Sequence, residues 1–134
     1  MSSGISVVVP AFNRAPLIAQ TLKSIFGQTL PADEIIVVDD GSTDSTIEAA
    51  EAEFSVLRSQ SSAKGKLPDF KVIRQENAGP GAARNRGFAE SSGRFIHFFD
   101  SDDIAAPNKH EVQVGALQTT GADIAYGPWV KGYI

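Results

Sequence analysis

Short apolar runs alternate along this chain with longer segments whose apolar residues recur at helical spacing. The runs "ISVVV" and "IIVV" are nearly continuous in valine and isoleucine, which is typical of strands that are buried on both faces. Strands are expected at residues 5–9, 34–38, 70–74, 94–99 and 123–126. Because strands that alternate with helices pair in parallel, the pattern predicts an α/β fold with helices covering a mostly parallel sheet.

The segments between the runs predict four helices and one long loop. The first helix ends near Gly27, and the second follows "DDGSTDS", where Ser45 and Glu48 have capping-box spacing. Residues 55–68 are polar and lack a clear period, so a mobile surface loop is expected there. The third helix is expected in "GAARNRGFAESS" and the fourth near Pro107. The apolar inner positions of the first and fourth helices are Leu17, Ile18, Leu22, Ile25, Phe26, His110, Val114 and Leu117.

Charged and polar residues follow each of the first four expected strands, in "PAFNR", "DDGSTD", "QENAGPGAARNRG" and "DSDD". The carboxyl ends of parallel strands lie at one edge of a sheet, where ligands of α/β proteins bind. Side chains from four loops are therefore expected to form one composite pocket. These side chains are Phe12, Asn13, Arg14, Asp39, Asp40, Arg84, Arg86, Asp100, Asp102 and Asp103.

Three carboxylates lie close together in "FIHFFDSDD", at Asp100, Asp102 and Asp103. Like charges this close repel one another unless a cation or a hydrogen-bonding ligand compensates. Mg²⁺ and Mn²⁺ prefer oxygen ligands, and the absence of cysteine excludes thiolate metal sites. The cluster therefore predicts a divalent cation site, and the alternative is that one or more of these aspartates caps the following turn.

Other candidate residues have two interpretations each. Asp39, at a strand end, can accept a hydrogen bond from a base or ribose, whereas Asp40 fits ordinary Asp-Gly-Ser turn chemistry. Arg84 can supply a charged fork to a phosphate or a base carbonyl, and Arg86 either contacts the ligand or pairs with a nearby carboxylate. Phe12 either stacks on a base or packs against the protein, and mid-strand His97 is interpreted as structural.

The composition narrows the class of protein. A length of 134 residues fits one domain, and a net charge of −4 argues against a nucleic-acid partner. No apolar run approaches the roughly 20 residues of a membrane-spanning helix. The first residues do not resemble a signal peptide and there are no cysteines, so a cytoplasmic location is expected.

Four motifs, "ISVVVPAFNR", "IIVVDDGSTD", "NAGPGAARNRG" and "FIHFFDSDD", occur in the order found in the nucleotide-sugar half of family 2 glycosyltransferases. The chain resembles that family over nearly its whole length. The resemblance implies a GT-A fold, a Rossmann-like, mostly parallel sheet with helices on both faces, truncated before the acceptor-binding half. Residues 1–134 would then be the donor-binding part of a GT-A domain.

The resemblance also implies roles for matching residues. The loop that lines the nucleoside pocket in the family corresponds to Pro10, Ala11, Phe12 and Arg14. Asp39 matches the aspartate that hydrogen-bonds the base, usually uracil, and Arg84 matches the arginine that reaches the base or diphosphate. The family's DxD motif corresponds to Asp100, Ser101 and Asp102. Asp100 would lie toward ribose or metal, and Asp102 would coordinate Mn²⁺ or Mg²⁺.

By this resemblance, the protein would transfer a sugar from a nucleotide donor, usually a UDP-sugar, to an acceptor hydroxyl with inversion, as in polysaccharide biosynthesis. The acceptor would be a glycan, a lipid or a protein, and the catalytic base would lie further along a longer chain, associated with the cytoplasmic face of a membrane. This segment alone would bind donor but transfer poorly, and its "GPWVKGYI" tail would favour homo-oligomers.

The alternative is a non-catalytic nucleotide-binding module. A dehydrogenase is disfavoured because "PAFNRAP" replaces the glycine-rich first turn.

Overall fold

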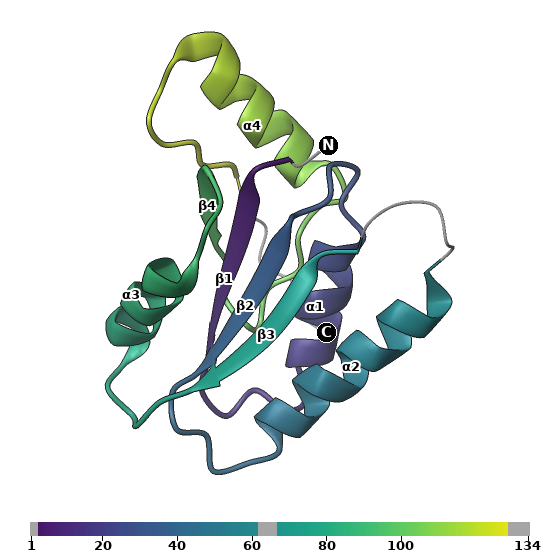
Figure 1. The fold of residues 1–134 in the computed structure, drawn as a ribbon, viewed down its shortest axis with the longest axis vertical. Coiled ribbons are helices and arrows are strands. Elements are labelled where there is room, and N and C mark those ends of the chain that lie inside the picture. Colours follow the sequence, from purple (N-terminus) through teal and green to yellow (C-terminus); the bar gives the residue numbers. More distant parts are fainter. Residues whose placement is uncertain (1–2, 62–66, 129–134) are drawn as a thin grey trace.

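The computed structural model describes residues 3–61 and 67–128, which form a four-stranded, all-parallel sheet with helices on both faces (Figure 1). In chain order the elements are β1 (Ile5–Ala11), α1 (Ile18–Phe26), β2 (Glu34–Asp39), α2 (Thr46–Gln60), β3 (Asp69–Arg74), α3 (Pro80–Glu90), β4 (Phe95–Phe98) and α4 (Lys109–Thr120). The strand order is β3-β2-β1-β4. The α/β fold with a parallel sheet, predicted from the alternating pattern, is confirmed.

The two central strands divide the core between the two faces of the sheet. Every residue of β1 is buried, as are all residues of β2 except Glu34. Ile35 and Val37 belong to the apolar cluster on the α1 side, whereas Ile36 and Val38 pack with Ala83 of α3. Alternate residues of a strand point to opposite faces, so continuous apolar runs serve both layers.

Helix α3 lies unusually close to the sheet at Gly87. A Cβ atom added at Gly87 would lie 2.2 Å from Cγ1 of Val8 in β1. A side chain of any size would therefore push α3 away from the sheet, whereas glycine allows the helix backbone to touch it. This contact fixes the position of the second half of α3.

The edge strands differ from the prediction of strands buried on both faces. β3 and β4 contain only partly buried and exposed residues, because each is paired on one side alone in the described chain. The fifth strand expected at residues 123–126 does not form, so that prediction is wrong. Ile124 and Tyr126 are 81% and 92% exposed, and no neighbouring strand of the described residues pairs with this segment.

Helix α2 corrects two further predictions. It continues to Gln60, so residues 55–60 of the expected loop are helical, and residues 62–66 lie outside the described part. Ser45 makes no side-chain capping bond. Instead, Asp44 accepts a hydrogen bond from the backbone N–H of Thr46 at 3.0 Å, so the capping group lies one residue earlier than the capping-box spacing suggested.

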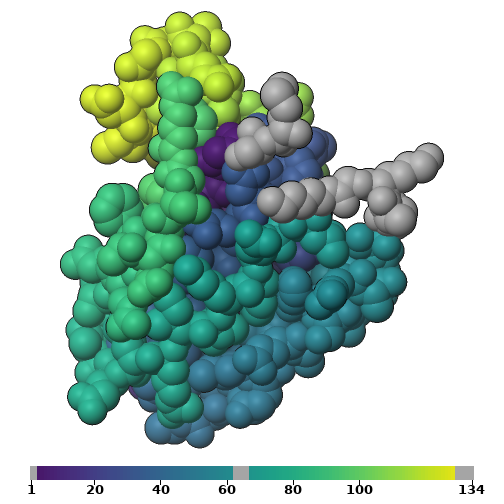
Figure 2. All heavy atoms as spheres, in the orientation of Figure 1, coloured from purple at the N-terminus to yellow at the C-terminus, as the bar shows by residue number. Residues whose placement is uncertain are grey.

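Helix α4 and residues 121–128 project beyond the rest of the described chain (Figure 2). Its buried residues are His110 and Val114, as expected for its inner side. His110 donates its backbone N–H to Oε1 of Gln28 at 2.9 Å, and its Nε2 lies 2.9 Å from Nδ1 of His97 in β4. Within residues 3–61 and 67–128, no helix has the length and apolar character needed to cross a membrane.

Candidate functional site

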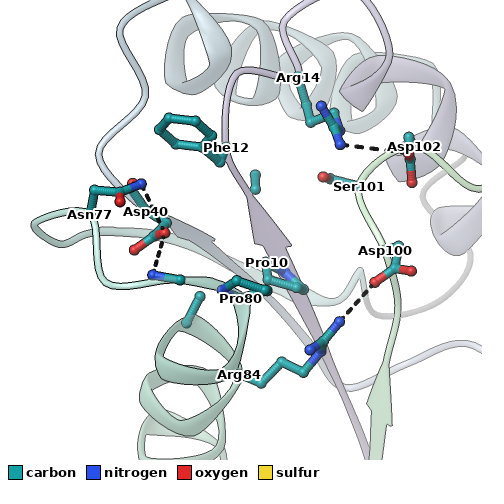
Figure 3. A pocket seen from close by; sticks show the side chains of 13 residues that line it. Pro10, Phe12, Arg14, Asp40, Asn77, Pro80, Arg84, Asp100, Ser101 and Asp102 are labelled. Carbon is teal, nitrogen blue, oxygen red and sulfur yellow. Dashed lines mark hydrogen bonds and ion pairs between the residues drawn. The ribbon is translucent and has the colours of Figure 1, made fainter.

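A pocket of about 510 Å³ lies beyond the carboxyl ends of the strands (Figure 3). The parallel register places Ala11 of β1 beside Asp39 of β2, so the loops that follow these strands begin side by side. The pocket is lined by Pro10, Ala11, Phe12, Arg14, Asp40, Asn77, Gly79, Pro80, Ala83, Arg84, Asp100, Ser101 and Asp102. The structure thus brings together residues from the loops after all four strands, as expected for a composite pocket.

An acidic cluster lies at one side of this pocket; Asp100 and Asp102 line the pocket, whereas Asp103, also expected on the rim, does not. Asp100, Asp102 and Asp103 each offer a carboxylate oxygen, and these oxygens lie within 4.8 Å of one another. Partial burial raises the pKa of Asp103, and the negative charges of Asp102 and Asp100 raise it further. An all-oxygen, anionic donor set with this convergence fits Mg²⁺ or Mn²⁺.

The two aspartates of the cluster that line the pocket, Asp100 and Asp102, each face an arginine from another part of the chain (Figure 3). Nη2 of Arg14 lies 3.7 Å from Oδ2 of Asp102, and Nη2 of Arg84 lies 3.3 Å from Oδ1 of Asp100. All four side chains are 40–57% exposed. Ion pairs this exposed contribute little to stability, so the arginines can exchange their carboxylate partners for a ligand anion at small cost.

Hydrogen bonds to the turn after β2 hold the loop after β1 in place. Asn13 adopts a positive φ of 52°, and its Oδ1 accepts a hydrogen bond from the backbone N–H of Thr43 at 2.8 Å. The next backbone N–H, that of Arg14, donates to Oγ1 of Thr46 at 2.8 Å. Asn13, expected on the rim, does not line the pocket and instead fixes the flanking residues Phe12 and Arg14.

Asp39 and Asp40 occupy different environments. Asp39 is 0% exposed and does not line the pocket. Its Oδ2 accepts a hydrogen bond from the backbone N–H of Ser42, while Oδ1 is buried with no hydrogen-bond partner among the described residues. Asp40 lines the pocket and accepts hydrogen bonds from the loop that precedes α3. A direct role of Asp39 in ligand binding stays a prediction.

The remaining candidates are distributed as follows. Phe12 lines the pocket and is 43% exposed, which leaves its ring free to contact a ligand. Arg86 does not line the pocket, and its Nε lies 3.5 Å from a carboxylate oxygen of Glu90 on the next helical turn. His97 does not line the pocket either, and its hydrogen bond with His110 joins β4 to α4.

Sequence reasoning missed part of the pocket wall. Asn77, Gly79, Pro80 and Ala83 line the pocket beside Arg84, although none was singled out as a candidate. The signal lay in the small residues of "GPGAAR", because glycine and alanine let a ligand approach the backbone closely. That pattern does not reveal which of the residues face the ligand.

The amino-acid sequence is similar to that of known glycosyltransferases. Residues 6–134 match the family model described as Glycosyl transferase family 2. Glycosyltransferase GlyG of Streptococcus pneumoniae is 37% identical over 95% of this chain and 39% of its own length. The uncharacterized glycosyltransferase YibD of Escherichia coli is 31% identical over 90% of this chain and 32% of its own length.

Solved structures show the same likeness. S. aureus TarS in complex with UDP has a TM-score of 0.74 and 29% identity, covering 92% of this chain and 34% of that one. Glucosyl-3-phosphoglycerate synthase from Mycobacterium tuberculosis, in complex with Mn²⁺, UDP and phosphoglyceric acid, has a TM-score of 0.66 and 32% identity, covering 86% of this chain and 39% of that one. The chain spans roughly a third of the length of these relatives.

Proposed function

Because the chain belongs to glycosyl transferase family 2, we propose that its pocket binds the nucleoside diphosphate of a sugar donor and presents the sugar to an acceptor hydroxyl. One observation carries the proposal. Loops from all four strands converge on a pocket of about 510 Å³ and bring two arginines against an acidic cluster. The volume lies in the range of small-molecule sites, and the mixture of charges suits a diphosphate with a divalent cation.

The diphosphate is assigned to the two arginines. Guanidinium groups donate paired, charge-assisted hydrogen bonds to phosphate oxygens. Arg14 approaches the pocket from the loop after β1 and Arg84 from helix α3, and each guanidinium makes an exposed ion pair with a cluster aspartate. Both can therefore turn toward a bound diphosphate while remaining close to the acidic cluster.

The cation is assigned to Asp102 and Asp100, with Asp103 beside them. The synthase from Mycobacterium tuberculosis has been solved with UDP and either Mn²⁺ or Mg²⁺, which supports the same pair of ions here. When bound, the ion would neutralise negative charge on the departing nucleoside diphosphate. The carboxylates would hold that ion and would thereby keep the diphosphate at a fixed place.

The nucleoside is assigned to the loop after β1. Phe12 offers an exposed ring for stacking, and Pro10 and Ala11 form the adjoining wall. The unpaired Oδ1 of Asp39 can accept a hydrogen bond from a base N–H once the ligand or the turn shifts to meet it. We favour UDP because TarS and the synthase were solved with it.

We propose that transfer inverts the anomeric carbon, with the acceptor hydroxyl attacking opposite the departing diphosphate. The hydroxyl proton needs a base, which we assign, following the family resemblance, to an aspartate outside residues 1–134.

Ser101 separates the two aspartates assigned to the ion and is 5% exposed, so its burial anchors the loop that presents them.

Thermal unfolding tests the donor site. UDP with Mn²⁺ should raise the Tm of the wild-type protein, because a ligand that binds only the folded state stabilises it. Asp102→Ala should remove the Mn²⁺-dependent part of that rise. Asp69→Ala is the matched control, since Asp69 is exposed and begins β3 at the opposite end of the sheet. A rise that survives in Asp102→Ala, or no rise for any nucleoside diphosphate, would refute the site.

A second assay separates an enzyme from a non-catalytic nucleotide-binding module. The two alternatives bind nucleotide alike, so the readout must be release of UDP from a UDP-sugar, with and without candidate acceptors. Hydrolysis or transfer above the Asp102→Ala background supports the transferase. Because the base is assigned outside residues 1–134, this assay uses a chain that includes the base, and tight binding by that chain without either reaction favours the module.

A further inference from the structure

The turn that carries the acidic cluster is held at both of its ends. It runs from Asp100 to Asp103, and the backbone N–H of Asp103 donates to the carbonyl oxygen of Asp100 at 3.3 Å, which is long for such a bond. At the first end, the backbone N–H of Phe99 donates to the carbonyl oxygen of Val8 in β1 at 2.9 Å. At the second end, Oγ1 of Thr21 in α1 donates to the carbonyl oxygen of Asp103 at 2.7 Å. The two end bonds therefore hold a turn whose own closing bond is weak.

Thr21 belongs to a polar stripe of three side chains, Thr21, Ser24 and Gln28, here called the anchor stripe. Oγ of Ser24 accepts a hydrogen bond from the backbone N–H of Ala105 at 2.9 Å, and Nε2 of Gln28 donates to the carbonyl oxygen of Ala106 at 2.6 Å. Residues three or four positions apart share one side of a helix, and Gln28 continues the stripe just beyond the end of α1. The stripe therefore follows the backbone of the segment after the acidic turn.

The hydrogen-bonding groups of the anchor stripe are matched to this segment. Thr21 and Gln28 are 1% and 5% exposed. The hydroxyl of Ser24 donates its proton to the carbonyl oxygen of Thr21 at 2.8 Å, which leaves its lone pairs to accept from Ala105. Oε1 of Gln28 accepts a hydrogen bond from the backbone N–H of His110 at 2.9 Å. The stripe thus supplies both donors and acceptors to the buried side of the segment.

Helix α1 gives the anchor stripe a fixed position relative to the sheet. Its residues Ile18, Leu22 and Ile25 are buried in the apolar cluster that includes β1 and β2. The helix cannot shift without uncovering this close-packed cluster. In the described part of the chain, every hydrogen bond that joins the backbone of residues 100–107 to a segment distant in the sequence comes from the stripe or from Thr29, just after it. The core therefore sets where this loop lies.

The acidic turn needs such an anchor because its side chains repel one another. Carboxylate oxygens of Asp100, Asp102 and Asp103 lie within 4.8 Å of one another, and like charges this close favour any movement that separates them. The bond from Thr21 holds the Asp103 end of the turn against α1 and opposes such a movement. A cation then meets ligands that already converge, so its binding loses less free energy to ordering them.

We propose that Thr21 is a positioning residue for the divalent cation of the donor site. The inference deepens the proposed function and rests on it. Thr21 does not line the pocket, so it acts through the main chain of Asp103 and not by touching the ligand. Its contribution is to affinity for the cation. Affinity for the nucleotide without a cation should be independent of it.

Calorimetric titration of UDP at a series of fixed Mn²⁺ concentrations tests the inference. The quantity compared is the Mn²⁺ concentration that gives half of the Mn²⁺-dependent gain in UDP affinity, called the Mn²⁺ midpoint. Thr21→Val keeps the shape of the side chain but removes the hydroxyl, so the Mn²⁺ midpoint should rise about fivefold to tenfold. Thr21→Ser keeps the hydroxyl and should stay within about twofold of wild type. UDP affinity without Mn²⁺ should be the same in all three proteins.

A double variant shows whether Thr21 acts through the cation site. Asp102→Ala removes the best candidate ligand, so the Mn²⁺-dependent gain should be lost in that background. Adding Thr21→Val to Asp102→Ala should then change UDP affinity less than about twofold at any Mn²⁺ concentration, because the group that it helps to position is gone.

Hydrogen exchange supplies a readout that is independent of binding. The amides of Asp103 and Ala105 should exchange faster in Thr21→Val than in wild type, because the loop loses one of its anchors. Thr119→Val is the matched control, since Oγ1 of Thr119 also donates to a backbone carbonyl at 2.7 Å, that of Gly115 within α4. The control should leave both the Mn²⁺ midpoint and the exchange of these two amides unchanged.

Should Thr21→Val fail to fold, Ser24→Ala replaces it. This variant loses the hydrogen bond with the backbone N–H of Ala105, and its Mn²⁺ midpoint should rise about twofold to threefold. A wild-type Mn²⁺ midpoint in the folded variant would overturn the positioning role, as would an equal loss of UDP affinity with and without Mn²⁺. A wild-type protein that binds no UDP, or that gains no affinity from Mn²⁺, would instead refute the donor site itself.

Discussion

Adjacent aspartates at the end of β2 show how the environment of a residue decides what it can do. Asp40 uses both oxygens to hold the next loop, whereas Asp39 is fully buried with Oδ1 unpaired. Leaving a buried polar atom without a partner costs about 1–3 kcal/mol. A ligand N–H that reached Oδ1 would recover part of that free energy, which is why we keep Asp39 in the proposed nucleoside site.

Also at the scale of the residue, we expect substitution of Asn13 to lower the stability of the fold measurably. Its φ of 52° is unfavourable for most side chains, and its Oδ1 accepts a hydrogen bond from Thr43. Asn13→Ala loses the hydrogen bond and strains the backbone, so the free energy of unfolding should fall by about 2–3 kcal/mol. Asn13→Gly, the matched variant, relieves the strain and should lose about 1 kcal/mol less. Urea unfolding measures both, and equal losses would show that the backbone is not strained.

At the scale of elements, the packing of α3 on β1 gives the second prediction. Gly87→Ala places a methyl group 2.2 Å from Cγ1 of Val8, and overpacking of this kind costs about 1–3 kcal/mol or more. Gly81→Ala is the control, since a Cβ atom at Gly81 meets nothing within 4 Å and alanine favours helix. Thermal unfolding should show a lower Tm for the first variant and an equal or higher Tm for the second.

The junction of β4 and α4 predicts a pH dependence. Burial, with a smaller effect of the charges on His110 and Lys109, lowers the pKa of His97 to about 3, far below the ordinary 6.5. The unfolded chain therefore binds a proton that the folded chain excludes, so this contribution to stability is complete above pH 6.5 and is lost as the pH falls toward 3. Burial also lowers the pKa of His110, which adds to the loss in the same direction.

The matched variant His97→Gln keeps a side chain that can hydrogen-bond His110 but cannot bind a proton. Between about pH 7 and pH 5, urea unfolding of wild type should lose up to about 1.4 kcal/mol per pH unit more than the variant does. The same pH slope in both proteins would show that His97 does not titrate on unfolding.

For the whole molecule, the sequence predicts the elements whose signals are local. Continuous apolar runs located β1 and β2 within two residues, and the loops after four strands predicted the pocket because parallel strands share one edge. The GT-A assignment is confirmed by the solved relatives, which share the fold at TM-scores of 0.74 and 0.66. The acceptor classes and the homo-oligomer stay predictions, and residues 129–134 of the tail assigned to self-association lie outside the described residues.

The features that the sequence did not reveal depend on distant partners. Asp40 accepts hydrogen bonds from residues 35–39 positions later in the chain. Turn propensity is a local signal, so from the sequence Asp40 was interpreted only as a turn residue. The absent strand at 123–126 has a suitable composition, yet a strand needs a neighbour to pair with. Helix α2 extends through the polar residues 55–60 because helix length reflects packing as well as pattern.

A crystal structure of the protein with UDP and Mn²⁺, with anomalous scattering to locate manganese, tests the central claim most directly. The account predicts one manganese peak within coordination distance of a carboxylate oxygen of Asp102, with the diphosphate between that ion and the guanidinium of Arg84. Nucleotide bound away from this pocket, or manganese bound without contact to Asp100 or Asp102, would contradict it.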